Sequence, residues 1–252
     1  EIFNKPSKGS VNGFSHFAIK AECDGEVLDA RVLHGDLRPP YTGSLGRDRF
    51  QSFGFGPPRE YLTGVPHFED VVFHGKFPIA ELAFLDDAFP GDVTLTAFNP
   101  FVPLNDRDSG IPAAFFEVAV ENPTDDWITY TIAGTLHNPL PGNNAHSYQR
   151  TYRTHWLHLS SDGLDPDDLD YGTLTLATGA TGDDPCEAEP ACGDYATISP
   201  GDVSYQSYWF RGRWFDNLEV YWHDFTAPGP LQDRHYPVEK AGDGNHATLA
   251  VR

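Results

Sequence analysis

Proline and glycine interrupt this chain so often that long helices cannot form in it. The 252 residues include 21 Pro and 24 Gly. No Pro- and Gly-free window of 11 or more residues carries apolar side chains at the 3.6-residue period of a helix. Short runs instead alternate apolar and polar residues, the pattern of half-buried strands. We therefore predict an all-β fold, a large antiparallel sandwich of two sheets that forms a single domain over residues 1–252.

Turn signals separate the predicted strands. The strands are expected at 93–97, 116–121, 128–132, 154–159, 173–178, 203–208, 218–225 and 246–252. The loops are expected at 38–64, 99–113, 138–147, 160–171, 179–194 and 226–246. The run Asn122-Pro123-Thr124-Asp125-Asp126 is a strong turn signal. It predicts that the strands on either side of it pair as a hairpin.

The charge balance excludes whole classes of partner. Thirty-seven acidic residues against 17 basic ones give a formal net charge of −20. Such a surface repels phosphate backbones and anionic lipid head groups, so we expect neither nucleic acid nor a membrane as partner. Only five bases are lysines. Excess acid with few lysines favours a halophilic protein, because concentrated salt screens the repulsion; an ordinary acidic protein is the alternative.

No run of apolar residues approaches the length of a membrane helix, so we expect no membrane insertion. No signal peptide is visible either. A cytoplasmic location is therefore expected, with export as the alternative.

The three cysteines suggest a disulfide that closes a short loop rather than a metal centre. Cys186 and Cys192 bracket a short acidic stretch, and a disulfide between them would contribute about 2 kcal/mol on the chain-entropy estimate. A zinc site is the weaker alternative, because no second Cys or His pair lies nearby in the sequence. Cys23 is expected to be a free thiol.

Two other patterns resemble metal motifs but fit them poorly. His155 and His158 are three residues apart in a predicted strand and would therefore point to opposite faces. The acidic run 165–170 lacks the Gly and Glu that a helix–loop–helix calcium site requires, so a solvated loop is expected, with a loosely held cation as the alternative. We expect no metal and no cofactor.

Three segments resemble motifs of one enzyme family. They are EIFNKPSKG at the start, AFNPFVPLN followed by DSGIPAA at 97–114, and YWFRGRWFDNLE at 208–219. These are similar to segments of glycoside hydrolase family 116, the bile-acid β-glucosidase and glucosylceramidase family. The resemblance implies an N-terminal β-sandwich packed on an (α/α)6 toroid, which carries the two catalytic carboxylates of a retaining β-glucosidase.

The catalytic pair is not expected within this chain. The chain has no Met and begins at Glu1, and the Gly-rich stretch that precedes this motif in the family is absent. We therefore expect a portion of a longer polypeptide, with the catalytic domain beyond residue 252. That domain is the expected partner, and the β-glucoside substrate would be shared with it. No catalytic residue is carried over to this chain.

Two groups of polar residues within these motifs could face that partner or its substrate. They are Asn99, Asp106, Asp108 and Ser109 in the first, and Arg211, Trp214, Asp216 and Asn217 in the second. In the first group, side chains that cap backbone amides are the simpler interpretation. In the second, aromatic rings could stack on sugar rings, or an Arg–Asp pair could anchor an interdomain contact.

Other functions are open. A stand-alone carbohydrate-binding module would need exposed tryptophans on one sheet face; the candidates are Trp127, Trp156, Trp209, Trp214 and Trp222. A purely structural assembly domain would show a large apolar patch. A self-contained glycosidase would need a carboxylate pair, and Glu219 and Asp224 are the best local one. In a regular strand, however, these two would point to opposite faces.

Overall fold

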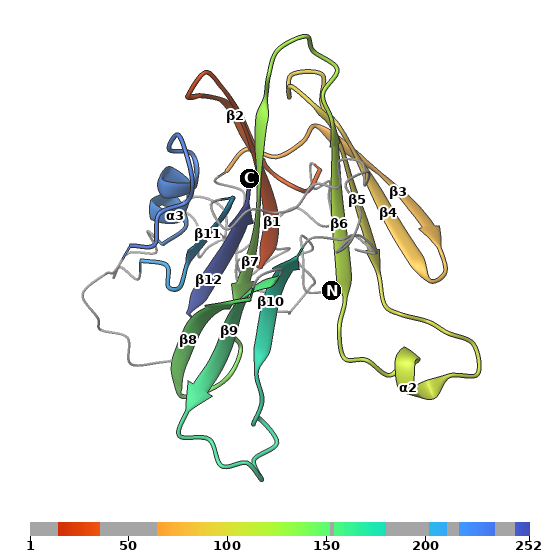
Figure 1. Ribbon diagram of the computed structural model, residues 1–252, viewed down its shortest axis with the longest axis vertical. Coiled ribbons are helices and arrows are strands. Elements are labelled where there is room, and N and C mark those ends of the chain that lie inside the picture. Colours follow the sequence, from red (N-terminus) through yellow and green to blue (C-terminus); the bar gives the residue numbers. More distant parts are fainter. Residues whose placement is uncertain (1–14, 36–64, 152–153, 180–201, 211–216, 235–244) are drawn as a thin grey trace, which may run out of the picture. The chain divides into compact units, whose positions relative to one another are not determined.

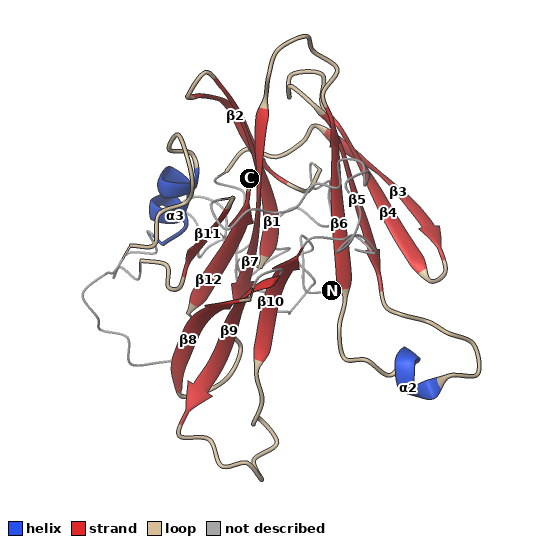
Figure 2. Ribbon diagram, in the orientation of Figure 1, coloured by secondary structure: helices blue, strands red, loops and turns tan. Residues whose placement is uncertain are grey.

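The computed structural model describes residues 15–35, 65–151, 154–179, 202–210, 217–234 and 245–252. Over these residues β-strands dominate, with the helices α2 (Asp106–Ser109) and α3 (Asn217–Phe225) between them (Figures 1 and 2). All sheet pairing between named strands is antiparallel, so the predicted all-β antiparallel fold is confirmed; its strands form three sheets. None of the described helices has the length and apolarity to span a membrane.

The chain divides into two compact units, with boundaries between Phe17 and Ala18 and between Tyr130 and Thr131. The first, which we call the N-terminal unit, contains β2 to β6, α2 and most of β1. The second, the C-terminal unit, contains β8 to β12, α3 and most of β7. Each is described by itself.

The N-terminal unit is built from a hairpin and a four-stranded meander. Its strands are β1 (His16–Cys23), β2 (Glu26–Val32), β3 (Asp70–Lys76), β4 (Ile79–Leu85), β5 (Asp92–Phe98) and β6 (Phe115–Glu121). The first two pair around the turn at Asp24 and Gly25, where both residues have positive φ. The other four follow the chain order β3-β4-β5-β6, as short connections between antiparallel strands allow.

One face of the four-stranded sheet is entirely apolar. The register places Val71, Phe84, Val93 and Val120 in one row across the strands, and Phe73, Leu82, Leu95 and Val118 in the next. Phe84, Val93 and Leu95 are buried, and the ring of Phe84 packs against that of Phe68 at 5.1 Å. The edge residue Phe73 is 63% exposed, so this face is covered at its centre and open at the β3 edge.

The C-terminal unit is a two-layer sandwich. Its strands are β7 (Thr129–His137), β8 (Asn143–Arg150), β9 (Thr154–Asp162), β10 (Leu174–Gly179), β11 (Val203–Gln206) and β12 (His246–Val251). One layer has the order β10-β9-β8, and the other contains the run β11-β12-β7. Leu157 and Leu159 of β9, Leu136 of β7 and Ala247 of β12 form a common buried core between these layers.

A group of hydrogen-bonded side chains in the interior and the helix α3 complete this unit. The hydroxyls of Thr135 and Thr248 lie 2.8 Å apart, and the indole Nε1 of Trp209 donates to Thr248 Oγ1 at 2.8 Å. The Tyr221 ring stacks on Trp209 at 4.0 Å, and its hydroxyl oxygen accepts from Thr135 Oγ1 at 3.4 Å. Burial raises the pKa of the Tyr221 phenol, which keeps the phenol neutral.

Three local predictions were wrong. Residues 218–225 form a helix, because Leu218, Tyr221 and Phe225 fall at the spacing that gives a helix one buried face. The hairpin predicted around residues 122–126 does not form: β6 pairs with β5 and β7 pairs with β12, so the two strands lie in different sheets. The loop predicted at 138–147 contains the start of β8.

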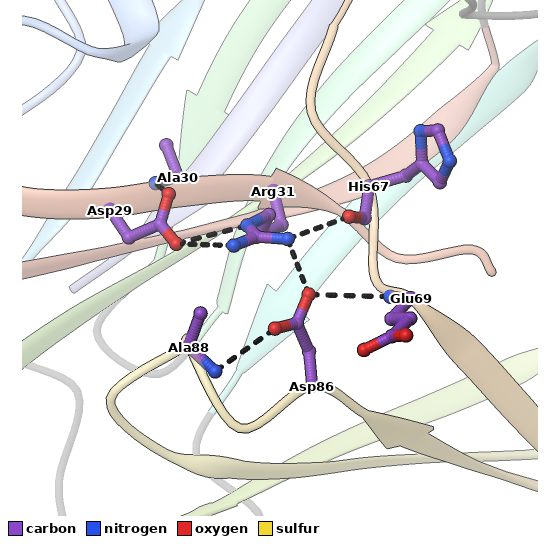
Figure 3. Close-up of polar contacts among 7 residues, drawn as sticks. All are labelled: Asp29, Ala30, Arg31, His67, Glu69, Asp86 and Ala88. Carbon is purple, nitrogen blue, oxygen red and sulfur yellow. Dashed lines mark hydrogen bonds and ion pairs between the residues drawn. The ribbon is translucent and has the colours of Figure 1, made fainter. Parts of the chain in front are cut away.

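Arg31 on β2 ties together three separate parts of the N-terminal unit (Figure 3). Its Nε and Nη2 each lie 2.9 Å from Oδ2 of Asp29 on the same strand. Its Nη1 donates to the carbonyl oxygen of His67 at 2.8 Å and to Asp86 Oδ2 at 2.5 Å. The planar guanidinium can serve all three acceptors at once, which a lysine ammonium on its flexible stem cannot do with the same geometry.

Asp86 completes this arrangement from the turn between β4 and β5. Besides Arg31, it accepts backbone amides from Glu69 at 3.3 Å and from Ala88 at 3.0 Å. Burial by itself would lower the pKa of the Arg31 guanidinium, but the hydrogen bonds and charges of Asp29 and Asp86 outweigh it and raise that pKa. The guanidinium therefore stays charged, and its bond to Asp86 fixes the turn relative to β2.

His146 on β8 is a half-buried titratable group of the C-terminal unit with a strongly lowered pKa. Its ring stacks on Tyr208 at 4.5 Å, and its Nδ1 donates to the carbonyl oxygen of Ser207 at 2.6 Å. Its Nε2 accepts from Asn138 Nδ2 at 3.1 Å, so the neutral ring satisfies both partners. Desolvation lowers the pKa of His146 from 6.5 to about 4, against the opposing hydrogen bond to Ser207.

Replacement of Arg31 by Lys should lower the free energy of unfolding by about 2 kcal/mol, because the multiple charge-assisted hydrogen bonds are lost while the charge is kept. Urea unfolding followed by circular dichroism measures this. The matched control is Arg150→Lys, at an exposed arginine of β8. An equal effect of both substitutions would show that the arrangement around Arg31 is not special.

Acidification should destabilise the chain through His146. The pKa of His146 is lower in the folded state than in the unfolded state. The neutral ring therefore contributes its full stabilisation of the folded state above pH 6.5, and this stabilisation is lost as the pH falls toward 4. This loss amounts to about 3 kcal/mol. The difference in unfolding free energy between wild type and His146→Gln should therefore change across this interval. The control is His74→Gln, at an exposed histidine of β3, which should leave the pH dependence of the unfolding free energy unchanged. If the unfolding free energies of wild type and His146→Gln differed by the same amount at every pH, the account would be contradicted.

Candidate functional site

The loop between β5 and β6 is held by its own polar side chains. The amide of Asn99 donates to the carbonyl oxygen of Ala113, which closes the base of the loop. Ser109 Oγ accepts from Val102 N at 2.9 Å and donates to Val102 O at 3.0 Å. Two of the predicted site residues, Asn99 and Ser109, therefore bond to loop backbone, which is the simpler of the two interpretations that the sequence allowed.

The helix α2 within this loop is capped by Asn105. Its Oδ1 accepts from the backbone amide of Asp108 at 3.1 Å, and its Nδ2 donates to Asp108 Oδ2 at 2.6 Å. The carboxylates of Asp106 and Asp108 lie in the first turn, where the helix dipole favours negative charge. Asp106, Asp108 and Ser109 are thus brought together, and Asp106 is exposed.

Aromatic side chains surround the loop and the neighbouring end of the sheet. Phe77, in the turn between β3 and β4, contacts Phe101 edge to face with ring centroids 5.1 Å apart. Phe98 and Phe115, at the ends of β5 and β6, stack at 5.3 Å. All four are exposed, and Phe77 is 81% exposed. We call these four residues, together with Leu104, the aromatic end of the sheet.

This end lies in the stretch of chain that carries most of the exposed apolar side chains. Of 16 exposed large apolar residues within the described part of the chain, twelve lie between Val72 and Phe116. The register divides the strand residues among them between the two faces of the sheet, with Phe98 and Phe115 on one face and Phe73 and Phe116 on the other. Exposed apolar side chains that contact one another mark interaction sites, so the aromatic end and its loop are the candidate functional site.

The sequence did not single out Phe77, Phe101 or Leu104. A signal was nonetheless present, since Phe101-Val102-Pro103-Leu104 is an apolar run inside a predicted loop, where polar residues are expected. Phe77 lies in a short turn, where no alternation of apolar and polar residues would indicate its exposure. Its exposure follows only from the pairing of β3 with β4.

The second predicted group is described only at Asn217, the first residue of α3 in the C-terminal unit. Arg211, Trp214 and Asp216 lie outside the described residues, as do Cys186 and Cys192. Cys23 is a free thiol.

Glu219 and Asp224 occupy different surroundings on α3. Glu219 is exposed, whereas Asp224 is buried and bound. Asp224 Oδ1 lies 2.8 Å from Arg234 Nη2, and its Oδ2 accepts from Gln206 Nε2 at 3.1 Å. A buried carboxylate held in this way by Arg234 and Gln206 serves as a structural anchor.

The side chains of the two candidate metal motifs contact other protein groups at hydrogen-bonding distance. Nδ1 of buried His155 lies 2.5 Å from the Tyr148 hydroxyl, and Nδ1 of His158 lies 2.8 Å from Thr175 Oγ1. In the acidic loop, Asp165 and Asp168 accept backbone amides two residues on, each at 3.0 Å. Within the described ranges, no group of three or more His, Cys, Asp or Glu side chains could hold a metal ion.

The described tryptophans do not form a shared exposed face. Trp127 is 95% exposed, Trp209 is buried, and Trp156 and Trp222 are half-buried. Trp214 lies outside the described residues. A single exposed tryptophan gives one stacking surface rather than the row that a carbohydrate-binding sheet face would present.

Comparison with known proteins assigns the chain to a family. A family model described as "beta-glucosidase 2, glycosyl-hydrolase family 116 N-term" matches residues 6–252. No curated protein matches. The match spans nearly the whole chain and includes the loop between β5 and β6 as well as both units. The chain therefore belongs to the family of N-terminal domains of glycosyl-hydrolase family 116.

Proposed function

We propose that this chain is a non-catalytic β-sandwich domain of a β-glucosidase or glucosylceramidase, and that it packs on the catalytic domain and shapes its active site. The family match supports the first part, since an N-terminal domain of a glycoside hydrolase implies a catalytic partner and a carbohydrate substrate. The aromatic end of the sheet and its loop supply the surface for the contact.

The exposed apolar surface is the observation that carries the proposal. Burial of apolar surface contributes about 25 cal/mol per Å², so the exposed rings of the aromatic end represent a substantial driving force for association. The self-bonded loop between β5 and β6 makes this surface rigid before it meets its partner, which reduces the entropy lost on contact. A rigid loop at a domain boundary can also form a wall of the neighbouring pocket.

The catalytic carboxylates are assigned to the partner domain. Glycoside hydrolysis with retention requires two acids, one raised in pKa and one ionised, on either side of the same bond. Glu219 and Asp224 do not fit these roles, because Asp224 is held by Arg234 and Gln206 while Glu219 faces solvent. The sugar, its linkage and its aglycone would be selected by residues of both domains.

The alternative is a stand-alone carbohydrate-binding module. Exposed Trp127 favours it, because its ring is free to cover the C–H face of a sugar. The turn before it is ordered, since Asn122 accepts from Thr124 N at 3.0 Å and donates to the carbonyl oxygen of Asp126 at 2.8 Å. A single ring without further exposed tryptophans among the described residues gives this alternative less support than the aromatic end of the sheet gives the docking role.

The 252-residue chain should show no hydrolysis of an aryl β-glucoside, because the proposal assigns both catalytic acids to the partner domain. The same chain joined to that domain should be active, with retention of configuration at the anomeric carbon. Release of the aryl group measures activity, and proton NMR of the first-formed sugar gives the stereochemistry. Turnover by the 252-residue chain that disappears in its Glu219→Gln variant would overturn the proposal.

Titration of the 252-residue chain with β-linked gluco-oligosaccharides should give no saturable heat of binding. Quenching of tryptophan fluorescence offers a second readout, with Trp127→Ala as the matched variant. Saturable binding that is lost in Trp127→Ala would favour the carbohydrate-binding module over the docking domain.

A further inference from the structure

Leu104 combines two properties that the fold of this chain does not explain. It is fully exposed, at 107% of the reference surface for leucine. Its φ is +64°, in the left-handed region that residues with a Cβ atom rarely adopt. An exposed leucine gains nothing from burial, and glycine or asparagine would adopt this backbone conformation more readily. The described part of the chain thus gives Leu104 neither burial nor a readily adopted backbone conformation.

The surrounding loop fixes Leu104 in its exposed position. On one side, Val102 O accepts from both Asn105 N at 3.0 Å and Ser109 Oγ at 3.0 Å. On the other, the Asn105 cap begins α2 directly after Leu104. Figure 1 shows this loop, with α2, projecting beyond the ends of β5 and β6. A side chain that is held rigidly on a projecting loop loses little entropy when it inserts into a pocket.

The neighbours of Leu104 in sequence and space suit an apolar contact. Phe101, in the same loop, packs edge to face on Phe77 and leaves both rings exposed. The charged residues next to it, Asp106, Arg107 and Asp108, follow in α2. An apolar centre with a charged rim is the usual composition of a protein–protein contact.

We propose that Leu104 is the anchor of the interdomain contact, and that it inserts into an apolar pocket of the catalytic domain in the same polypeptide. This inference rests on the proposed function and deepens it by naming the residue that carries the contact. The catalytic domain is the occupant favoured here, because the family match describes an N-terminal domain and exposed rings contact one another at the loop, between Phe101 and Phe77, and at the strand ends that flank it, between Phe98 and Phe115. Small sets of central residues dominate such contacts.

The test compares the 252-residue chain with the polypeptide that also carries the catalytic domain. Leu104→Cys is introduced into both, and the rate of labelling by a thiol reagent is read from the modified peptide by mass spectrometry, so that native cysteines are resolved separately. Labelling at position 104 should slow by about tenfold or more when the catalytic domain is present, since the thiol becomes buried. The matched control is Leu169→Cys, at an equally exposed leucine of the acidic loop, which should react alike in both.

Phe77→Cys and Phe115→Cys separate failure of the anchor from failure of the proposed function. Protection at 77 and 115 without protection at 104 would overturn the anchor and leave the docking surface in place. No protection at any of the three would overturn both. Protection at 104 in the 252-residue chain alone that grows with its concentration would identify a second copy as the occupant, and would also overturn the proposal.

Discussion

A sheet face composed only of apolar side chains has to be covered, and this requirement governs the N-terminal unit. The register of β3 to β6 places every second residue of four strands on one such face. Phe84, Val93 and Leu95 meet the requirement inside the unit, and Arg31 with Asp86 holds the β4–β5 turn against β2 at that end. At the opposite end, near the loop that contains α2, Phe98 and Phe115 lie on the other face of the sheet and remain exposed. Exposed rings that gather in this way mark an interaction site.

The C-terminal unit meets the same requirement internally. Its two layers share the Leu136, Leu157, Leu159 and Ala247 core, and Thr135, Thr248 and Trp209 bond to one another within the unit. The half-buried, neutral His146 ring is likewise satisfied, by Asn138 and Ser207. The contrast between the units assigns the interaction surface to one of them and a mainly structural role to the other.

The sequence predicted what depends on local alternation and failed where pairing is not local. Strands such as β5, β9 and β10 alternate regularly, because one face is buried and the other is not. β8, with the sequence NNAHSYQR, has almost no apolar pattern; its place depends on its pairing with β9 and on partners such as Tyr208 and Asn138. The turn signal at 122–126 marked a real break, but a turn signal does not specify which sheet the next strand joins. The helix α3 was missed because nine residues are too few to show a clear period. For the candidate site, the motif placed the loop correctly, but the exposure of Leu104 and Phe77 follows only from the three-dimensional arrangement.

The central claim is that the aromatic end of the sheet is an interface in the longer polypeptide. Amide hydrogen exchange tests it most directly, by comparing the 252-residue chain with the same chain joined to its catalytic domain. The account predicts slower exchange in the loop between β5 and β6 and in the β3–β4 turn when the catalytic domain is present, with the acidic loop around Leu169 unchanged. Identical exchange in the two proteins at the loop and the turn would contradict it.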